Sequence, residues 1–244
     1  MNNLQAQRVM GISGLMVGLG VMITIPLYFI YSGAPPAWNV LTRDLLNLLV
    51  LASMLIFFAC FSQLIRRADA TLDWLASLFY GAGMLFLAVA FVSIANEAGV
   101  VFGDSSGTLD PTIDGVLAHA NILMHGSIRR LLTVVMLVPA GYAVLRTRML
   151  PGWVGWSAYV IAACNLVFVP SLYFGTDVTK FYSAIGWGNS AFVASFLGYW
   201  ILAVGLASLR RKVRSLDHVA RSMDACMAQD SQQVAARDVR NARA

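Results

Sequence analysis

This chain of 244 residues is 59% hydrophobic and only 12% charged, and its formal net charge is +5. Soluble domains carry roughly 25% charged residues, so this composition leaves too little polar surface to cover a water-soluble globule. It therefore excludes an ordinary soluble domain, and anchoring at a membrane surface explains the modest positive charge without a nucleic-acid partner.

Six stretches of the chain contain no Asp, Glu, Lys or Arg. They are Val9–Tyr31, Leu45–Leu64, Trp74–Ala95, Leu131–Leu145, Met149–Gly175 and Phe181–Leu209. About 20 apolar residues cross the hydrocarbon layer as an α-helix, and five of the stretches reach that length alone. Strands of a barrel would alternate polar and apolar residues, which these stretches do not. We therefore expect an all-α integral membrane bundle in residues 1–212, with six spans at about 9–31, 44–64, 73–96, 119–145, 150–174 and 181–209.

Basic residues collect in alternate gaps between these spans. One set of gaps and ends carries Arg8, Arg66, Arg67, Arg146, Arg148, Arg210, Arg211, Lys212 and Arg214. The gap 96–119, in contrast, holds four carboxylates and no Lys or Arg. Because short cytoplasmic loops are enriched in Lys and Arg, both termini are predicted to be cytoplasmic. The first span is too long for the apolar core of a cleavable signal peptide, so we expect it to remain as an anchor.

Residues 213–244 differ in character from the spans. Apolar residues recur there at helical spacing, at Val213, Leu216, Ala220, Met223 and Met227. This pattern predicts a short amphipathic helix that lies on the inner leaflet or binds a cytoplasmic partner, followed by a mobile tail.

Small residues in the first span predict close helix packing. Gly14 and Gly18 form a small-xxx-small pair, which lets another backbone approach closely. Packing against a neighbouring span of the same chain is the first interpretation, and a homodimer seam is the alternative.

The three cysteines, Cys60, Cys164 and Cys226, share neither a compartment nor the spacing of metal ligands. His119 and His125 are six residues apart, whereas two ligands on one helix would be expected four apart. We therefore predict no disulfide, no metal site and no cofactor.

The most unusual polar segment opens the fourth span. Asn121, His125, Arg129 and Thr133 follow one another at i+4 and would form one polar stripe on a continuous helix. Arg129 lies 17 residues before Arg146, so it would sit roughly 5 Å below the outer boundary of a layer about 30 Å thick. At that depth Arg129 and Arg130 can reach lipid phosphates or loop carboxylates, or Arg129 can point inward and line a polar pocket.

Other polar groups on the outer side could complete such a pocket. The candidate ligand-binding residues are Asn121, His125, Arg129, Glu97, His119, Asp44, Asn165 and Asn189. For Asn165 and Asn189, hydrogen bonds between helices are the more common role. No nucleophile elbow, phosphate loop or dinucleotide fingerprint is present, so no catalytic residue is assigned.

The segment from Gly141 to Trp156 contains a span end, a basic turn and the sequence Leu150-Pro-x-x-x-Gly155. In this turn, and in the order and length of its spans, the chain resembles uncharacterised bacterial multi-pass membrane proteins of the domain-of-unknown-function type. The resemblance implies a six-span fold in a bacterial inner membrane and carries over no functional residue.

These observations favour a protein that binds a lipid-like or small anionic ligand in an outward-facing polar pocket. One alternative is a membrane-embedded enzyme, such as a cyclase or isomerase, that uses His125 or Glu97 as acid or base. A transporter or a scaffold subunit are further alternatives, although the almost uncharged middles of the spans argue against ion coupling.

Overall fold

The computed structural model of the chain describes residues 3–31, 33–104, 109–110, 114, 117–177 and 179–210. The side chains of residues 3, 4, 119, 122 and 125 are not included in this description. The predicted tail 213–244, with its amphipathic helix, and the side chains of His119 and His125 therefore lie outside the described residues.

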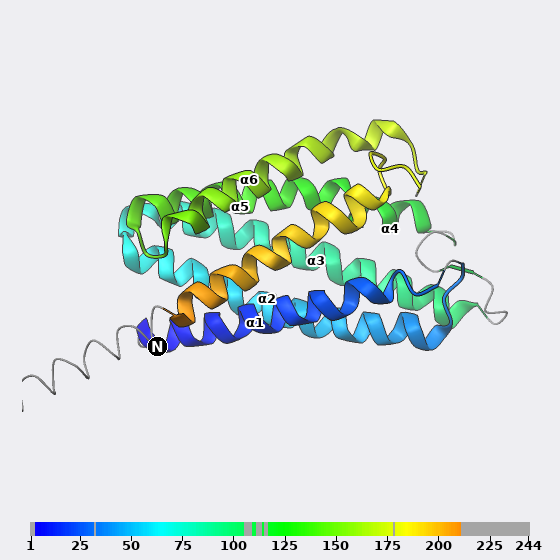
Figure 1. Cartoon of the computed structure of the whole chain (residues 1–244), viewed down its shortest axis with the longest axis horizontal. Coiled ribbons are helices and arrows are strands. Elements are labelled where there is room, and N and C mark those ends of the chain that lie inside the picture. The colour runs from blue at the N-terminus through cyan, green and yellow to red at the C-terminus, as the bar shows by residue number, and fades with distance from the viewer. Residues whose placement is uncertain are drawn as a thin grey trace, which may run out of the picture.

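The described residues form an all-helical fold (Figure 1). Its elements are α1 (Asn3–Leu27), α2 (Ala37–Ala68), η1 (Ala70–Leu72), α3 (Asp73–Gly103), α4 (Ala118–His125), α5 (Ser127–Thr147), α6 (Gly152–Phe168) and η2 (Val169–Phe174). A last helix opens with the π-helical turn η3 (Gly188–Val193) and continues to Arg210. Within the described residues, six segments are long and apolar enough to cross a membrane: Gln5–Leu27, Ala37–Ala68, Ala70–Gly103, Ser127–Thr147, Gly152–Phe174 and Gly188–Arg210. The prediction of an all-α chain with six apolar spanning helices is confirmed in these terms.

The helices pack in the order α1, α2, α3, α5, α6, and the last helix crosses this row (Figure 1). Trp200 fixes the crossing point, because its ring packs edge-on against Phe57 and Phe61 of α2, with centroids 6.4 and 5.7 Å apart. Its Nε1 atom donates a hydrogen bond of 3.2 Å to the carbonyl oxygen of Val154 in α6. Phe79 of α3 completes this buried aromatic cluster, with its centroid 4.9 Å from that of Phe61.

The two ends of the bundle differ. Asn3, Arg210 and the turns after α2 and α5 lie at one end, which we call the terminal end (Figure 1). The connections that follow α1, α3 and η2 lie at the opposite end, which we call the loop end (Figure 1).

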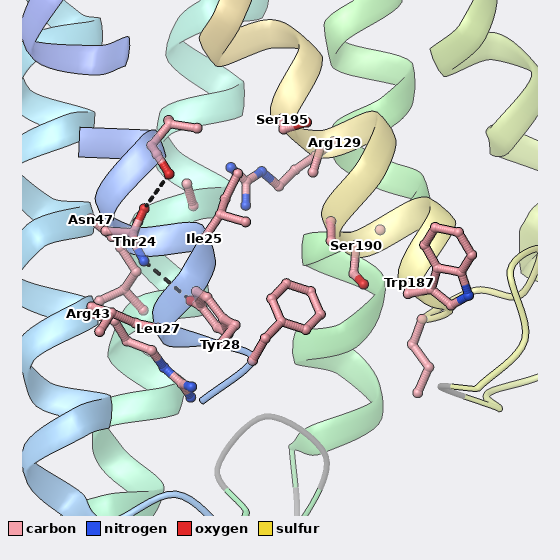
Figure 2. Close-up of a pocket in the computed structure, with 18 of the residues that line it drawn as sticks. Thr24, Ile25, Leu27, Tyr28, Arg43, Asn47, Arg129, Trp187, Ser190 and Ser195 are labelled. Atoms are coloured by element: carbon pink, nitrogen blue, oxygen red, sulfur yellow. Dashed lines mark hydrogen bonds between the residues drawn. The ribbon is translucent and has the colours of Figure 1, made fainter. Parts of the chain in front are cut away.

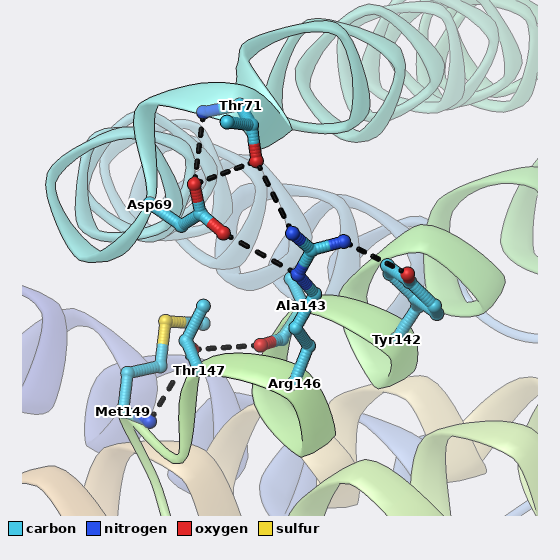
Figure 3. Close-up of polar contacts among 7 residues, drawn as sticks. All are labelled: Asp69, Thr71, Tyr142, Ala143, Arg146, Thr147 and Met149. Atoms are coloured by element: carbon cyan, nitrogen blue, oxygen red, sulfur yellow. Dashed lines mark hydrogen bonds and ion pairs between the residues drawn. The ribbon is translucent and has the colours of Figure 1, made fainter.

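A polar cluster at the terminal end joins η1 to α5 (Figure 3). The Arg146 guanidinium pairs with Asp69 at 3.3 Å and donates to the hydroxyl groups of Tyr142 and Thr71 at 3.2 and 3.5 Å. Asp69 also accepts hydrogen bonds from the hydroxyl and the backbone N–H of Thr71, at 2.6 and 2.9 Å. The bonds from Thr71, with a smaller contribution from Arg146, hold the pKa of the Asp69 carboxyl below its ordinary value.

The fourth predicted span begins as two helices rather than one. Gly126 separates α4 from α5 with φ −91° and ψ −114°, a conformation outside the helical region. Glycine adopts it at little cost because it has no Cβ atom. The stripe from Asn121 to Thr133 is therefore interrupted, and its two halves belong to different helices.

The sixth predicted span starts later than its apolar run. Residues 181–186 form bends, and the last helix begins at Gly188. A Cβ atom on Gly188 would lie 2.5 Å from the carbonyl oxygen of Phe181, so the chain before the helix folds back tightly on its first turn. Hydrophobicity alone could not separate this folded connection from the helix that follows it.

Candidate ligand-binding cavity

A cavity of about 620 Å³ opens at the loop end between α1, α2, α3, the start of α5 and the last helix (Figure 2). Its apolar wall includes Val50, Leu51, Met54, Phe86, Ala90, Ile94 and Leu197. Its polar lining consists of Thr24, Tyr28, Arg43, Asn47, Asp110, Asp114, Arg129, Ser190 and Ser195. A largely apolar cavity with a few polar groups is typical of a small-molecule site.

A seam of small residues explains why the cavity lies at this end. Toward the terminal end, Cβ atoms on Gly14 and Gly18 would lie 2.8 Å from the Ile201 carbonyl oxygen and 2.6 Å from the Leu202 side chain. The last such contact toward the loop end joins Gly198 to Val21, and both of these residues line the cavity. The two helices thus pack closely up to this point and line the cavity beyond it. Gly14 and Gly18 therefore pack against the last helix of the same chain, which was the first interpretation of this pair.

Arg129 lies in the first turn of α5 and extends into the cavity (Figure 2). Its guanidinium carbon is 4.5 Å from the centroid of the Phe86 ring, which is a cation–π contact. Among the described residues it forms no ion pair, and its buried Nε atom has no hydrogen-bond acceptor. The cavity therefore contains a guanidinium whose charge is not matched by a carboxylate of the described chain.

Arg43 also lines the cavity, but its charge is matched. It forms a buried ion pair with Glu97 of α3, and its guanidinium carbon lies 4.2 Å from the centroid of the Tyr28 ring. Asn47, one turn further along α2, donates a hydrogen bond of 3.3 Å to the Tyr28 hydroxyl oxygen. These contacts hold Arg43 and Tyr28 in place at the α1–α2 side of the cavity (Figure 2).

Two predicted site residues, Glu97 and Asp44, lie behind the cavity and do not line it. Glu97 is completely buried, and its carboxylate forms the ion pair with Arg43. Asp44 is buried beside this pair, and neither of its carboxylate oxygens has a hydrogen-bond partner among the described residues. Glu97 therefore has no direct access to a substrate in the cavity.

The predicted asparagines form contacts between elements of the bundle. Asn121 accepts a 2.6 Å hydrogen bond from the Ser93 hydroxyl, and Asn165 accepts a 3.2 Å bond from Arg130. Asn189 donates to the Ser171 hydroxyl at 2.9 Å and to the Ala184 carbonyl at 3.0 Å. None of the three lines the cavity, so these side chains hold helices and connections together around it.

Of the eight candidates, Arg129 is the one described side chain that lines the cavity, and its role in binding stays a prediction. Arg130 is only 2% exposed and contacts Asn165 inside the bundle, whereas Arg129 is half-buried and lines the cavity. Neither Arg43 nor Tyr28 was among the residues that the sequence indicated for the site. The spacing of Arg43 and Asn47, four residues apart, could have indicated one polar helix face.

A scan of protein-family models, a search of curated proteins and a search of solved structures each returned no match.

Proposed function

We propose that this chain is a multi-pass protein of a bacterial inner membrane that binds a lipid-like or small anionic ligand in the cavity at the loop end. In this proposal both termini are cytoplasmic and the loop end faces outward. The charge distribution supports the orientation, because Arg66, Arg67, Arg146 and Arg148 lie at the terminal end, whereas Asp104 and Asp177 lie at the loop end.

The observation that carries the proposal is the guanidinium of Arg129, which lies beside an apolar wall and forms no ion pair with any described residue. Removing a charged group from water costs several kcal/mol unless an opposite charge and hydrogen bonds compensate for it. The Phe86 ring supplies only about 0.5–2 kcal/mol of this compensation. A phosphate or carboxylate group would supply the rest, because its oxygens match the planar donors of guanidinium.

The dimensions of the cavity agree with a ligand larger than a simple ion. Its volume of about 620 Å³ falls in the range of roughly 300–1,000 Å³ that holds drug-sized molecules. Its apolar lining, from Val50 through Leu197, would contact a hydrocarbon part, and Arg129 would contact the anionic group. An amphiphile satisfies both requirements.

Lipid retention tests the proposal. The full chain is purified in a mild detergent, dioleoyl phosphatidylglycerol is added, and retained lipid is counted by native mass spectrometry. We expect wild type to retain it and Arg129→Leu to lose roughly tenfold or more in affinity, because a hydrogen bond to a charged group contributes about 1.5–3 kcal/mol. Arg67→Leu removes the same charge from an exposed position at the terminal end and should retain the lipid as wild type does. Equal retention by both variants would refute the site.

A further inference from the structure

The wall of the cavity between α1 and the last helix consists of one face of each helix. From α1 it takes Val21, Thr24, Ile25 and Tyr28, and from the last helix Ser190, Ala191, Ala194, Ser195 and Gly198. Both sets follow helical spacing, so the two faces are opposed across the cavity (Figure 2). Beyond the contact between Val21 and Gly198, the two faces are separated by the cavity. We call this space the α1 slot.

The α1 slot lies in the outer part of the predicted spans. From Val21 to Tyr28 is seven residues, or about 10 Å of helix, which is a third of a hydrocarbon layer roughly 30 Å thick. Ile25, Ala191, Ala194 and Ser195 are half-buried, and Ile23 and Phe192 beside them are exposed. The rim of the slot is therefore apolar except for Ser195, and it adjoins exposed apolar side chains that a bilayer would contact.

The walls of the slot suit a hydrocarbon chain. Ala191 and Ala194 are small, so the last helix leaves width there, and Ile25 presents an apolar surface opposite. In a bilayer, exchanging one hydrocarbon contact for another is nearly neutral, so a chain can occupy such a space without a large cost.

The charges at the loop end favour entry of the ligand from the side of the bilayer. Asp110 and Asp114 line the cavity from the connection after α3, and the backbone N–H of Asp110 donates a 2.9 Å hydrogen bond to the Asp114 carboxylate. An anion that arrived from water at this end would enter a cavity lined by these two carboxylates. A head group that arrived sideways from the bilayer would pass Thr24, Ser190 and Ser195 instead.

We infer that the ligand of the cavity is a membrane lipid that enters sideways, with an acyl chain in the α1 slot and its phosphate group on Arg129. This inference rests on the proposed function and deepens it, because it selects a bilayer lipid over a water-soluble anion. It also assigns Ile25 and Ala194 as chain-contacting residues, which the unmatched charge alone would not identify.

Photo-crosslinking tests the slot directly. A benzophenone amino acid replaces Ile25 in the slot or, as the matched control, Ile23, which is 55% exposed on the same helix. The full chain is reconstituted in vesicles of phosphatidylcholine with a minor share of phosphatidylglycerol, and the lipid adducts are identified by mass spectrometry. We expect adducts at position 25 to be enriched in phosphatidylglycerol by roughly tenfold over the vesicle composition, with the enrichment lost in Arg129→Leu. Adducts at position 23 should follow the vesicle composition.

A second pair of variants compares a substitution that fills the slot with one outside it. Ala194→Trp places a large ring in it and should abolish retention of phosphatidylglycerol, whereas Phe192→Trp, on the exposed face of the same helix, should not. The melting temperatures of both variants, measured in detergent, show whether a loss of lipid retention is due to misfolding. If Ala194→Trp is misfolded, the crosslinking at position 25 decides whether the slot holds lipid. One result would overturn the slot and leave the proposed function standing: Arg129→Leu loses the lipid, but position 25 shows no enrichment and inorganic phosphate displaces the lipid from wild type. Lipid retained by Arg129→Leu would overturn both.

Discussion

Breaking the buried ion pair between Arg43 and Glu97 should be among the most destabilising single changes in this chain. The two side chains are 3% and 0% exposed, so neither charge can be solvated after its partner is removed. Removing one member of a buried pair costs about 3–5 kcal/mol, because the remaining charge is left uncompensated. For a chain of this size that corresponds to a fall of about 6–20 °C in melting temperature.

The two single variants should differ, because Asp44 lies beside the pair. Glu97→Leu leaves Arg43 next to a carboxylate that has no hydrogen-bond partner among the described residues, so Arg43 can turn toward it. Arg43→Leu leaves two buried carboxylates and removes the guanidinium beside them. We therefore expect Arg43→Leu to lower the melting temperature more than Glu97→Leu, and Asp44→Leu to have little effect or to stabilise.

Thermal unfolding in detergent, followed by size-exclusion chromatography, measures these differences. Asp73→Leu is the control, because it breaks an exposed pair with Arg66 at 2.9 Å, and such pairs contribute about 0–1 kcal/mol. A fall in melting temperature for Glu97→Leu that is as small as that of this control, or larger than that of Arg43→Leu, would contradict the expected order.

Two further changes test the packing and the polar cluster at the terminal end. Gly14→Leu should destabilise the bundle by several kcal/mol, because its Cβ would lie 2.8 Å from the Ile201 carbonyl oxygen. Gly81→Leu should be tolerated, because a Cβ atom at position 81 would have no other atom within 4 Å. Their melting temperatures in detergent make the comparison, and equal losses would contradict it. Because the pKa of Asp69 is lowered by hydrogen bonds from Thr71, its carboxylate contributes stability above the ordinary pKa of 3.8, which is lost as the pH falls through the lower, folded-state value. Wild type should therefore lose more of its melting temperature than Asp69→Asn between neutral pH and this acidic range, and parallel curves would show that the carboxylate contributes nothing.

The number of spans could be predicted from the sequence because long charge-free runs leave a chain few other ways to satisfy its backbone. The helix ends could not. Arg43 and Glu97 fall just outside the predicted spans 44–64 and 73–96, yet α2 starts at Ala37 and α3 continues to Gly103. Both helices extend past the charges because these two residues, 54 positions apart, neutralise each other. A pattern of single residues cannot show such a pairing.

The glycines illustrate a second limit. The spacing of Gly14 and Gly18 predicted the close approach of another helix, and the close approach is present. Its partner, the last helix, could not be identified, because every span offers an apolar surface of similar composition. The position of the cavity depends on this partner, since the cavity begins where the contact between α1 and the last helix ends.

The polar stripe at the start of the fourth span shows how a membrane fold separates structural polar groups from a candidate site. The sequence presents Asn121 and Arg129 as equivalent members of one helix face, but the break at Gly126 places them on different helices. Asn121 then contacts Ser93, and the neighbouring Arg130 contacts Asn165. In a medium without water, each polar group requires a partner from the protein. Among the described residues, Arg129 is the cavity-lining cation for which the chain supplies an aromatic ring and no anion. Because no described residue forms an ion pair with it, Arg129 is the residue on which a ligand should depend, whatever its place in the stripe.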